Sequence, residues 1–224
     1  MFEGHTVTVL ICAKNEAINL PHVLPKIPIW VDEILVVDGH SSDGTAQIVK
    51  RESPTARLIE QPKTGKGDAL RFGIRNASSE IIATIDADGQ TDPADIFKFV
   101  QPLIRGADFA KGTRLKYGRP SSMRFHKFIG NKILVLAANL MFNAKYTDVA
   151  AGLRAFYKAK VEDVDITNGG EADQELQVGI LRKGLKVVEV PYTHLPRISG
   201  ESRFRDFPQG LRNLFAIIRT RAIG

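Results

Sequence analysis

Short apolar runs alternate with stretches of helical character over the first half of the chain. The apolar runs predict strands at residues 6–12, 33–37, 57–60, 80–85 and 107–111. The stretches between them predict helices at residues 17–26, 45–52, 66–76 and 93–104. Buried strands that are each followed by a helix indicate a parallel sheet that is covered on both faces. Because ligands bind at the carboxyl ends of the strands in such a sheet, we expect the functional residues to lie just after each strand.

The second half of the chain follows a less regular pattern. We expect helices at residues 123–142, 171–183 and 209–219, strands at 153–157 and 186–190, and polar loops at 116–122 and 199–207. No repeat, low-complexity segment or linker divides the chain. We therefore expect one domain that spans residues 1–224.

Composition narrows the class of protein without naming a function. Apolar residues make up 43% and charged residues 25% of the chain, which is typical of a globular domain. The single cysteine, Cys12, excludes an internal disulfide framework and fits a reducing compartment. The sequence has no signal-peptide pattern at its start, and no window approaches the ~18 apolar residues of a membrane span. Secreted disulfide proteins and integral membrane proteins are therefore not expected.

Positive charge is concentrated near the C-terminus. The net charge is +6, and residues 194–224 hold six arginines against Glu201 and Asp206. Such a segment fits an anionic partner, and it equally fits a solvated basic face. A nucleic-acid partner is not expected, because the segment carries no recognised motif.

Polar residues follow the first two predicted strands. Asn15 and Glu16 come after the first strand, and Asp38 ends the second, where a carboxylate can accept hydrogen bonds from a ribose or a base. Residues of these types are also common at helix starts, which is the structural alternative. The chain has neither a G-x-G-x-x-G motif nor a P-loop, and Gly65-Lys66-Gly67 does not complete one. Dehydrogenase and P-loop nucleotidase classes are therefore not favoured.

Two aspartates follow the strand at residues 80–85. Asp86 and Asp88 leave this strand into a turn, and Gln90 adds a neutral oxygen on the same turn. Carboxylate and amide oxygens are ligands that Mg²⁺ or Mn²⁺ takes, and such an ion also bridges phosphates. The position at a strand's carboxyl end, rather than the spacing alone, makes this pair a metal-site candidate.

Taken in order, the motifs resemble the family 2 glycosyltransferases, which have a GT-A fold. The segments that carry the resemblance are CAKNEA, VVDGHSSDGT, GKGDALRFG and DADGQ. Within that family the second half resembles the dolichol-phosphate mannosyltransferase branch, through KGTRL, DVAAGLRAFYK and EVPYTHLPRISGESRF. The resemblance covers roughly residues 6 to 218. It implies an α/β fold with a Rossmann-like, mostly parallel sheet, a nucleotide-sugar-binding half at 1–112 and an acceptor-binding half at 113–224.

The resemblance also implies roles for individual residues. Donor binding falls to Ala13, Asn15, Glu16, Asp38, Lys66, Asp86, Ala87, Asp88 and Arg114. The metal falls to Asp86, Asp88 and Gln90, and the acceptor phosphate to Arg124, Arg197, Ser202 and Arg203. Asp88, Arg114 and Asp148 are the catalytic candidates, and Asp148 is open to three roles: orienting a cation, contacting the metal's water, or acting as a base. The chain departs from the family pattern at Cys12, at Gly39 and in Ala151-Gly152-Leu153-Arg154.

The expected reaction is an inverting, Mg²⁺- or Mn²⁺-dependent transfer of a hexose from a GDP-mannose or UDP-glucose type donor to a polyprenyl phosphate. We expect it at the cytoplasmic face of a membrane, through peripheral contact with anionic lipid. Residues 124–142 lack acids, and residues 209–221 place Leu211, Leu214, Phe215 and Ile218 on one face, which also fits packing on the protein's own core. A homo-oligomer or a membrane-protein partner is left open. The alternatives are a soluble family 2 enzyme with a hydroxyl acceptor, a nucleic-acid-binding module and a non-catalytic sugar-nucleotide binder.

Overall fold

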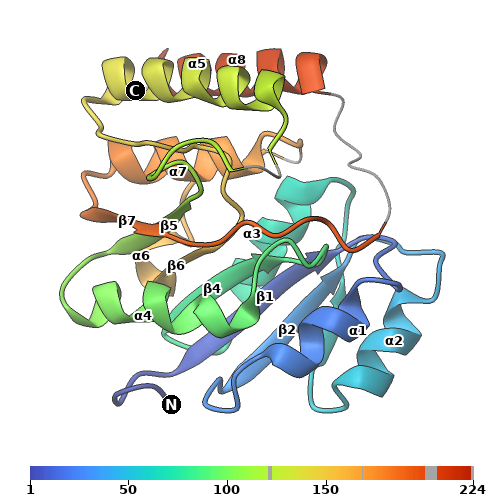
Figure 1. Ribbon diagram of the computed structural model, residues 1–224. Coiled ribbons are helices and arrows are strands. Elements are labelled where there is room, and N and C mark those ends of the chain that lie inside the picture. Colours follow the sequence, from blue (N-terminus) through green and yellow to red (C-terminus); the bar gives the residue numbers. More distant parts are fainter. Residues whose placement is uncertain (121–122, 168, 200–205, 223–224) are drawn as a thin grey trace.

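The structure is a computed structural model that describes residues 1–120, 123–167, 169–199 and 206–222. Its described strands form one sheet in the order β3-β2-β1-β4-β6-β5-β7 (Figure 1). The strands are β1 (Val7–Ala13), β2 (Glu33–Asp38), β3 (Arg57–Glu60), β4 (Ile81–Asp86), β5 (Phe109–Thr113), β6 (Arg154–Tyr157) and β7 (Val187–Pro191). The predicted mostly parallel α/β sheet is confirmed.

The helices lie close to their predicted ranges, except α6 (Lys158–Val161), which the sequence pattern does not predict. They are α1 (Leu20–Val23), η1 (Leu24–Lys26), α2 (Thr45–Glu52), α3 (Lys66–Asn76), η2 (Pro93–Asp95), α4 (Ile96–Ile104), α5 (Phe125–Phe142), α6 (Lys158–Val161), α7 (Ala172–Arg182) and α8 (Asp206–Ala222). The helix expected at 17–26 is shorter and divides into α1 and η1, because Pro25 has no N–H for a continuous helical ladder.

One strand, β6, runs opposite to the other strands of the sheet. β3, β2, β1 and β4 run parallel, but β6 pairs antiparallel with both β4 and β5. Thr84 of β4 lies opposite Arg154, the first residue of β6. The residues that precede β6 therefore reach the same edge as the carboxyl end of β4. The sequence pattern does not predict this reversal, which brings the second half of the chain to the candidate site.

Helices cover both faces of the sheet. On one face, β1 side chains such as Val9 pack with α1, α2 and α4, whose buried residues include Leu20, Val49 and Phe99. On the other, Leu10 packs with α3 and α7. Both faces of β1 are buried, which explains its uninterrupted apolar run.

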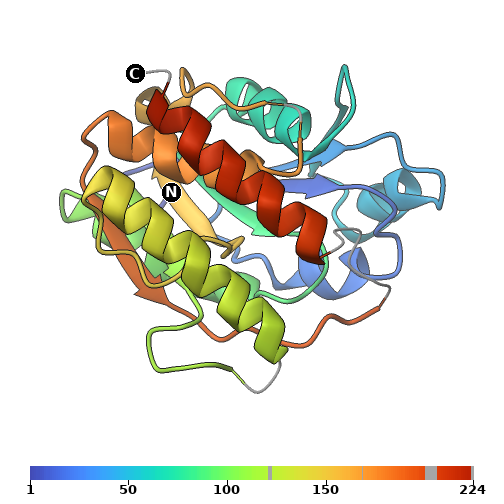
Figure 2. The same cartoon turned by 90° about the horizontal axis from the view of Figure 1, so that it is seen from above.

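A third layer lies outside α7. In Figures 1 and 2, α5 and α8 run side by side as the outermost layer, and Leu134, Ala138 and Ile217 form a separate apolar cluster beneath them. On α8, the apolar face that the sequence indicates points mostly to solvent, because Leu211, Phe215 and Ile218 are exposed. The residues of α8 that pack on the protein include Ala216 and Ile217, which are buried. None of the helices in the described ranges has the length and apolar character that a membrane crossing requires.

Candidate active site

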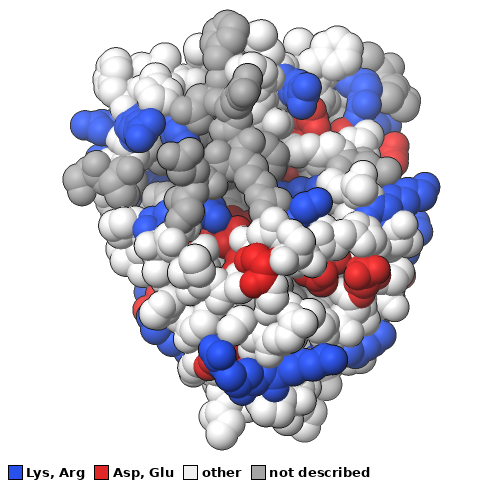
Figure 3. All heavy atoms as spheres, turned by 90° about the vertical axis from the view of Figure 1, so that its right-hand side faces the viewer, with Lys and Arg blue, Asp and Glu red and all other residues white. Residues whose placement is uncertain are grey.

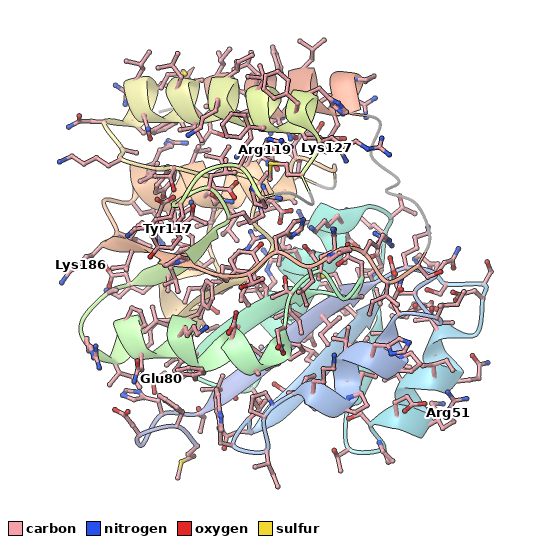
Figure 4. The ribbon with its side chains drawn as sticks, in the orientation of Figure 1. Arg51, Glu80, Tyr117, Arg119, Lys127 and Lys186 are labelled. Carbon is pink, nitrogen blue, oxygen red and sulfur yellow. The ribbon has the colours of Figure 1, made fainter. Side chains whose placement is uncertain are left out.

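Acidic side chains gather at the edge of the sheet where β1, β2 and β4 end. Figure 3 views this side of the molecule and shows acidic side chains across its middle, with basic side chains above and below them. Glu80, which precedes β4, lies on the opposite side, at the strand's amino end (Figure 4). The site predicted from the parallel strands therefore lies at the expected edge.

The loops after β1 and β2 are tied together by hydrogen bonds. The Asn15 backbone has a left-handed φ of 52°, a conformation that asparagine tolerates better than most residues. Its Oδ1 accepts from the Ser42 N–H at 2.8 Å, and its own N–H donates to Ser41 Oγ at 2.8 Å. Ala13 is buried beneath this junction, and its carbonyl accepts from the Gly39 N–H at 2.8 Å.

Asp38 has a free acceptor inside this junction. The side chain is buried, and its Oδ2 accepts from the Ser41 N–H at 3.0 Å. Oδ1 is buried and makes no hydrogen bond within the part of the chain that the structure describes. A buried carboxylate oxygen without a donor is unfavourable unless a ligand supplies one. Asp38 is thus well placed to accept from a ribose hydroxyl or a base N–H.

The metal candidates lie on the turn after β4, at residues 86–90, which we call the metal turn. Lys66 Nζ donates to Asp86 Oδ1 at 3.1 Å, and the Gln90 N–H donates to Asp88 Oδ1 at 3.1 Å. Burial and the nearby Asp86 charge raise the pKa of Asp88 to about 6, although Arg197 and the Gln90 N–H oppose the rise. Two neighbouring carboxylates in this environment favour a bound cation, so the turn fits Mg²⁺ or Mn²⁺. Ala87 lies buried between them.

The side-chain amide nitrogen of Gln90 contacts residues 192–199, which we call the strap. Its Nε2 lies 3.2 Å from His194 Nε2 and 3.4 Å from the Leu195 carbonyl oxygen. Burial lowers the pKa of His194 to about 4, so this imidazole is neutral at pH 7. No group of three or more His, Cys, Asp or Glu side chains suited to a metal occurs in the described ranges. The metal-ligand roles predicted for Asp86, Asp88 and Gln90 stay predictions.

The strap crosses the metal turn and carries Arg197 into it. The Leu195 N–H donates to the Gln90 carbonyl at 2.9 Å. The Arg197 guanidinium contacts Asp88 Oδ2 at 3.1 Å and Glu16 Oε1 at 2.7 Å. Arg197, which is expected at the acceptor phosphate, therefore contacts Glu16, expected at the donor, and Asp88, expected at the metal. In this arrangement the guanidinium neutralises carboxylates that a metal would otherwise neutralise.

A buried ion network supports Asp86 from below. Lys66 Nζ also contacts Asp173 Oδ2 at 2.7 Å, and Asp173 in turn pairs with the buried Arg154. Arg154 and Lys66 hold the pKa of Asp173 below its usual range, while the two acids Asp173 and Asp86 raise the pKa of Lys66. The network fixes Lys66 against Asp86. The sequence carries no signal for the pairing of Asp173 with these two cations.

Arg114 is held by Asp148 in a bidentate pair. Arg114 Nε donates to Asp148 Oδ2 at 2.7 Å and Nη2 to Oδ1 at 2.9 Å. Asn131 Nδ2 and the Ala150 N–H also donate to Oδ1, each at 2.9 Å. Arg114 holds the pKa of this fully buried carboxylate well below its usual range. These contacts favour the first of the three roles of Asp148, in which it orients a cation.

Lys111 and Glu189 lie beside the Arg114–Asp148 pair. Lys111 is buried, donates to the Asp148 carbonyl oxygen, and contacts Glu189 Oε1 at 2.7 Å. Burial lowers the pKa of Lys111 even though Glu189 opposes that shift. The sequence does not predict a role for Asn131, Lys111 or Glu189. They belong to ordinary strand and helix segments, and only the tertiary fold brings them together.

Arg124, predicted at the acceptor phosphate, makes no hydrogen bond or ion pair with this cluster in the described structure. Arg124 precedes α5 and is exposed. Ser202 and Arg203 lie outside the described residues. Ala151 and Leu153, where the chain departs from the family pattern, are both buried apolar side chains.

Gly152 lies against the metal turn. A Cβ at this position would lie 1.8 Å from Asp86 Oδ2, whereas a Cβ at Gly130 would meet nothing within 4 Å. We expect Gly152→Ala to lower the transfer rate at least tenfold, because the Asp86 carboxylate has to move away from its Lys66 contact. Gly130→Ala is the control and should leave the rate unchanged. Steady-state rates of the two folded variants check this, and equal rates would contradict the role given to Asp86.

Known proteins share both the sequence pattern and the fold. Residues 8–164 match the sequence profile described as Glycosyl transferase family 2. The chain is 30% identical over 200 residues to glycosyltransferase AglJ of Haloferax volcanii, covering 87% of this chain and 64% of that protein. It is 29% identical over 209 residues to dolichol-phosphate mannosyltransferase of Pyrococcus furiosus, covering 89% and 59%. The chain thus spans about three fifths of the length of these two relatives.

A solved structure has the same fold. Glucosyl-3-phosphoglycerate synthase of Mycobacterium tuberculosis, in complex with Mn²⁺, UDP and glucosyl-3-phosphoglycerate, superposes with a TM-score of 0.78 at 21% identity. The match covers 97% of this chain and 80% of that one. The expected GT-A fold is therefore confirmed.

Proposed function

The chain belongs to glycosyl transferase family 2 and is a glycosyltransferase, and from that premise we propose that it transfers a hexose from a nucleoside-diphosphate sugar to a polyprenyl phosphate. The reaction inverts the anomeric carbon, requires Mg²⁺ or Mn²⁺, and takes place at the cytoplasmic face of a membrane. Residues 1–112 bind the donor, and residues 113–224 bind the acceptor.

The donor side is supported by the carboxylates at the sheet edge. Asp38 offers its unpartnered Oδ1 to the nucleoside, and Glu16 lies on the neighbouring loop. Asp86 and Asp88 would hold the metal, which when bound supplies Lewis-acid neutralisation of the diphosphate leaving group. The M. tuberculosis synthase, which has the same fold and whose complex contains Mn²⁺ and UDP, is consistent with this assignment. Lys66 holds the Asp86 carboxylate in position through its 3.1 Å contact.

The ion pairs made by the acidic side chains of the site support a phosphate acceptor rather than a hydroxyl acceptor. Five carboxylates of the site are each engaged by a cation in the described structure: Glu16 and Asp88 by Arg197, Asp86 by Lys66, Asp148 by Arg114, and Asp173 by Lys66 and Arg154. A neighbouring cation stabilises the charged form of a carboxylate and weakens it as a base toward a hydroxyl group. Asp88, whose pKa burial and Asp86 raise to about 6, is assigned to the metal instead. A phosphate monoester is largely ionised at neutral pH, since its second pKa is about 6. Such an acceptor attacks without a general base.

Arginines supply the complementary charge for that acceptor. Arg114 is pre-oriented by Asp148, and Arg197 lies at the boundary between the donor carboxylates and the acceptor half. Guanidinium groups bind phosphate through charge-assisted, often bidentate hydrogen bonds. The P. furiosus relative, named as a dolichol-phosphate mannosyltransferase, is consistent with this acceptor class.

The proposal predicts a strong preference for a phosphorylated acceptor. With the same donor and metal, polyprenyl phosphate should be glycosylated at least a hundredfold faster than the matching polyprenyl alcohol or a free sugar. The alcohol lacks both the ionised nucleophile and the charge that the arginines recognise. Initial rates measured with labelled donor, at equal acceptor concentrations in one detergent, check this.

The same assay tests the alternative of a soluble acceptor. A faster rate with the alcohol or the free sugar would overturn the lipid-phosphate proposal in favour of a hydroxyl acceptor. A water-soluble phosphate monoester is the further control. If it is glycosylated faster than polyprenyl phosphate, the phosphate recognition stands and the lipid assignment fails.

A further inference from the structure

The outermost helices expose rows of large apolar side chains. We call this surface the α5–α8 face; its side chains are Phe125, Ile129, Ile133, Leu136, Leu140, Leu211, Phe215 and Ile218. Each is between 42% and 77% exposed, and the two helices run side by side at the top of the molecule (Figure 2). Single exposed apolar residues are ordinary, but rows of them on neighbouring helices mark an interaction surface.

These rows are additional to the packing of the helices on the protein. In α5 the exposed positions recur every three or four residues and form one line along the helix, while Leu134 and Ala138 on the other side are buried. In α8, Ala216 and Ile217 face the core. Arg219 of α8 also pairs with the buried Glu175 of α7. Both helices are thus already anchored inward, and their outward apolar rows have no partner in the described structure.

Cations outnumber acids in the segments that carry the α5–α8 face. The sequence contains no Asp or Glu from Phe109 to Thr147, and none after Asp206. Exposed cations flank the apolar rows: Arg124, Lys127, Lys132, Arg212 and Arg221. Lys127 lies at the first turn of α5, and Arg119 lies on the loop that leads to it (Figure 4). Lys132 Nζ lies 5.6 Å from the centre of the Phe128 ring, which keeps this cation beside the apolar row.

A hollow lies at the far end of the same layer. It has a volume of about 510 Å³ and its lining includes Leu140, Phe142, Arg182 and Arg221. Two guanidinium groups beside apolar side chains fit an anionic headgroup whose acyl chains lie along the helices. The basic groups therefore occur at both ends of the layer, as well as along it.

We propose that the α5–α8 face docks on the surface of an anionic lipid bilayer, with the apolar rows in the headgroup and acyl boundary and the flanking cations on lipid phosphates. An amphipathic helix pair with apolar and cationic side chains binds in this way. A second copy of the chain fits less well, because apposing two of these faces would bring cations against cations. The inference deepens the proposed function and rests on it for one consequence: a lipid acceptor would meet the site from this surface.

The position of the α5–α8 face relative to the catalytic edge would let a lipid acceptor reach the site from the membrane. Both helices begin on the side where the strap leaves the metal turn, and they run away from it (Figure 1). A bilayer along α5 and α8 would lie beside the acceptor half. A polyprenyl phosphate could then present its headgroup to the arginines while its chain stays in the membrane.

Vesicle binding of the purified chain tests the docking directly. The protein should sediment with phosphatidylcholine vesicles that contain phosphatidylglycerol, at least tenfold more strongly than with phosphatidylcholine alone, and should dissociate as salt is raised. The double variant Leu136→Gln, Phe215→Gln should lose at least tenfold in partition. Both positions are exposed, so the fold should be retained, which circular dichroism checks.

The matched control is Ile29→Gln, since Ile29 is a fully exposed apolar residue away from α5 and α8. It should partition as the unmodified chain does. Equal binding of the double variant and the unmodified chain would overturn the proposal. So would equal binding to neutral and anionic vesicles. A dimer in solution that the double variant abolishes, without vesicle binding, would assign the face to a second copy.

Failure of the docking and failure of the proposed function give different results. Transfer to a short-chain polyprenyl phosphate in detergent does not need a bilayer, and the double variant should keep that activity. Vesicle binding without such transfer would leave the docking face and remove the acceptor assignment. Transfer without vesicle binding would do the reverse.

Discussion

Asp88→Asn is expected to lower the transfer rate by about a thousandfold, which corresponds to roughly 4 kcal/mol of transition-state stabilisation. Asparagine keeps the shape of the side chain and the oxygen that accepts from the Gln90 N–H, but it removes the charge that would bind the metal. The fold should change little in stability, because burial and Asp86 already disfavour the charged form of Asp88. Transfer rates, Mn²⁺ binding and thermal unfolding of the variant measure the three effects separately.

Asp92→Asn is the matched control for this variant. Asp92 lies four positions on, where its Oδ1 accepts from the Ala94 N–H at the start of η2. Asparagine caps a helix start about as well as aspartate, so this change should be mild in activity and in stability. A rate for Asp88→Asn within a few-fold of the unmodified enzyme would remove Asp88 from the metal ligands.

Arg197→Gln is expected to have opposite effects on two measurements. Transfer to polyprenyl phosphate should fall by about 30- to 1000-fold, corresponding to roughly 2–4 kcal/mol, as for truncating one side of a buried charge pair. Binding of Mn²⁺ in the absence of nucleotide should become tighter. The guanidinium lies 3.1 Å from Asp88 Oδ2, so it competes with a metal for that carboxylate.

The control is Arg51→Gln. Arg51 lies in the last turn of α2 (Figure 4) and pairs with the adjacent Glu52. Its loss should affect neither measurement. Weaker Mn²⁺ binding by Arg197→Gln, or a transfer rate equal to that of Arg51→Gln, would contradict the competition between Arg197 and the metal.

The sheet and the donor edge could be predicted because their signals are local. Each parallel strand is a short apolar run, and Asp38 and Asp86 end such runs, so the chain order alone brings them to one edge. The helix boundaries were less predictable where prolines such as Pro25 change the hydrogen-bond pattern. The metal turn is likewise readable from consecutive residues.

The supporting ion pairs could not be predicted because they join distant segments. Lys66 meets Asp173 across 107 positions, and Arg197 meets Glu16 across 181. Those contacts depend on the antiparallel insertion of β6 between β4 and β5 and on the path of the strap, neither of which leaves a periodic pattern. The apolar residues of the last helix could be identified as a set, but whether they turn inward or outward depends on how Ile217 packs under α5.

The mass of the lipid product tests the central claim, transfer of a hexose to a polyprenyl phosphate, most directly. The purified protein is incubated with polyprenyl phosphate, Mn²⁺ and either GDP-mannose or UDP-glucose, and the lipid fraction is analysed by mass spectrometry. The account predicts one hexose joined to the lipid through a single phosphate with one of these donors, and no such product with a metal chelator. A hexose found instead on a hydroxyl acceptor, with the polyprenyl phosphate unchanged under both donors, would contradict it.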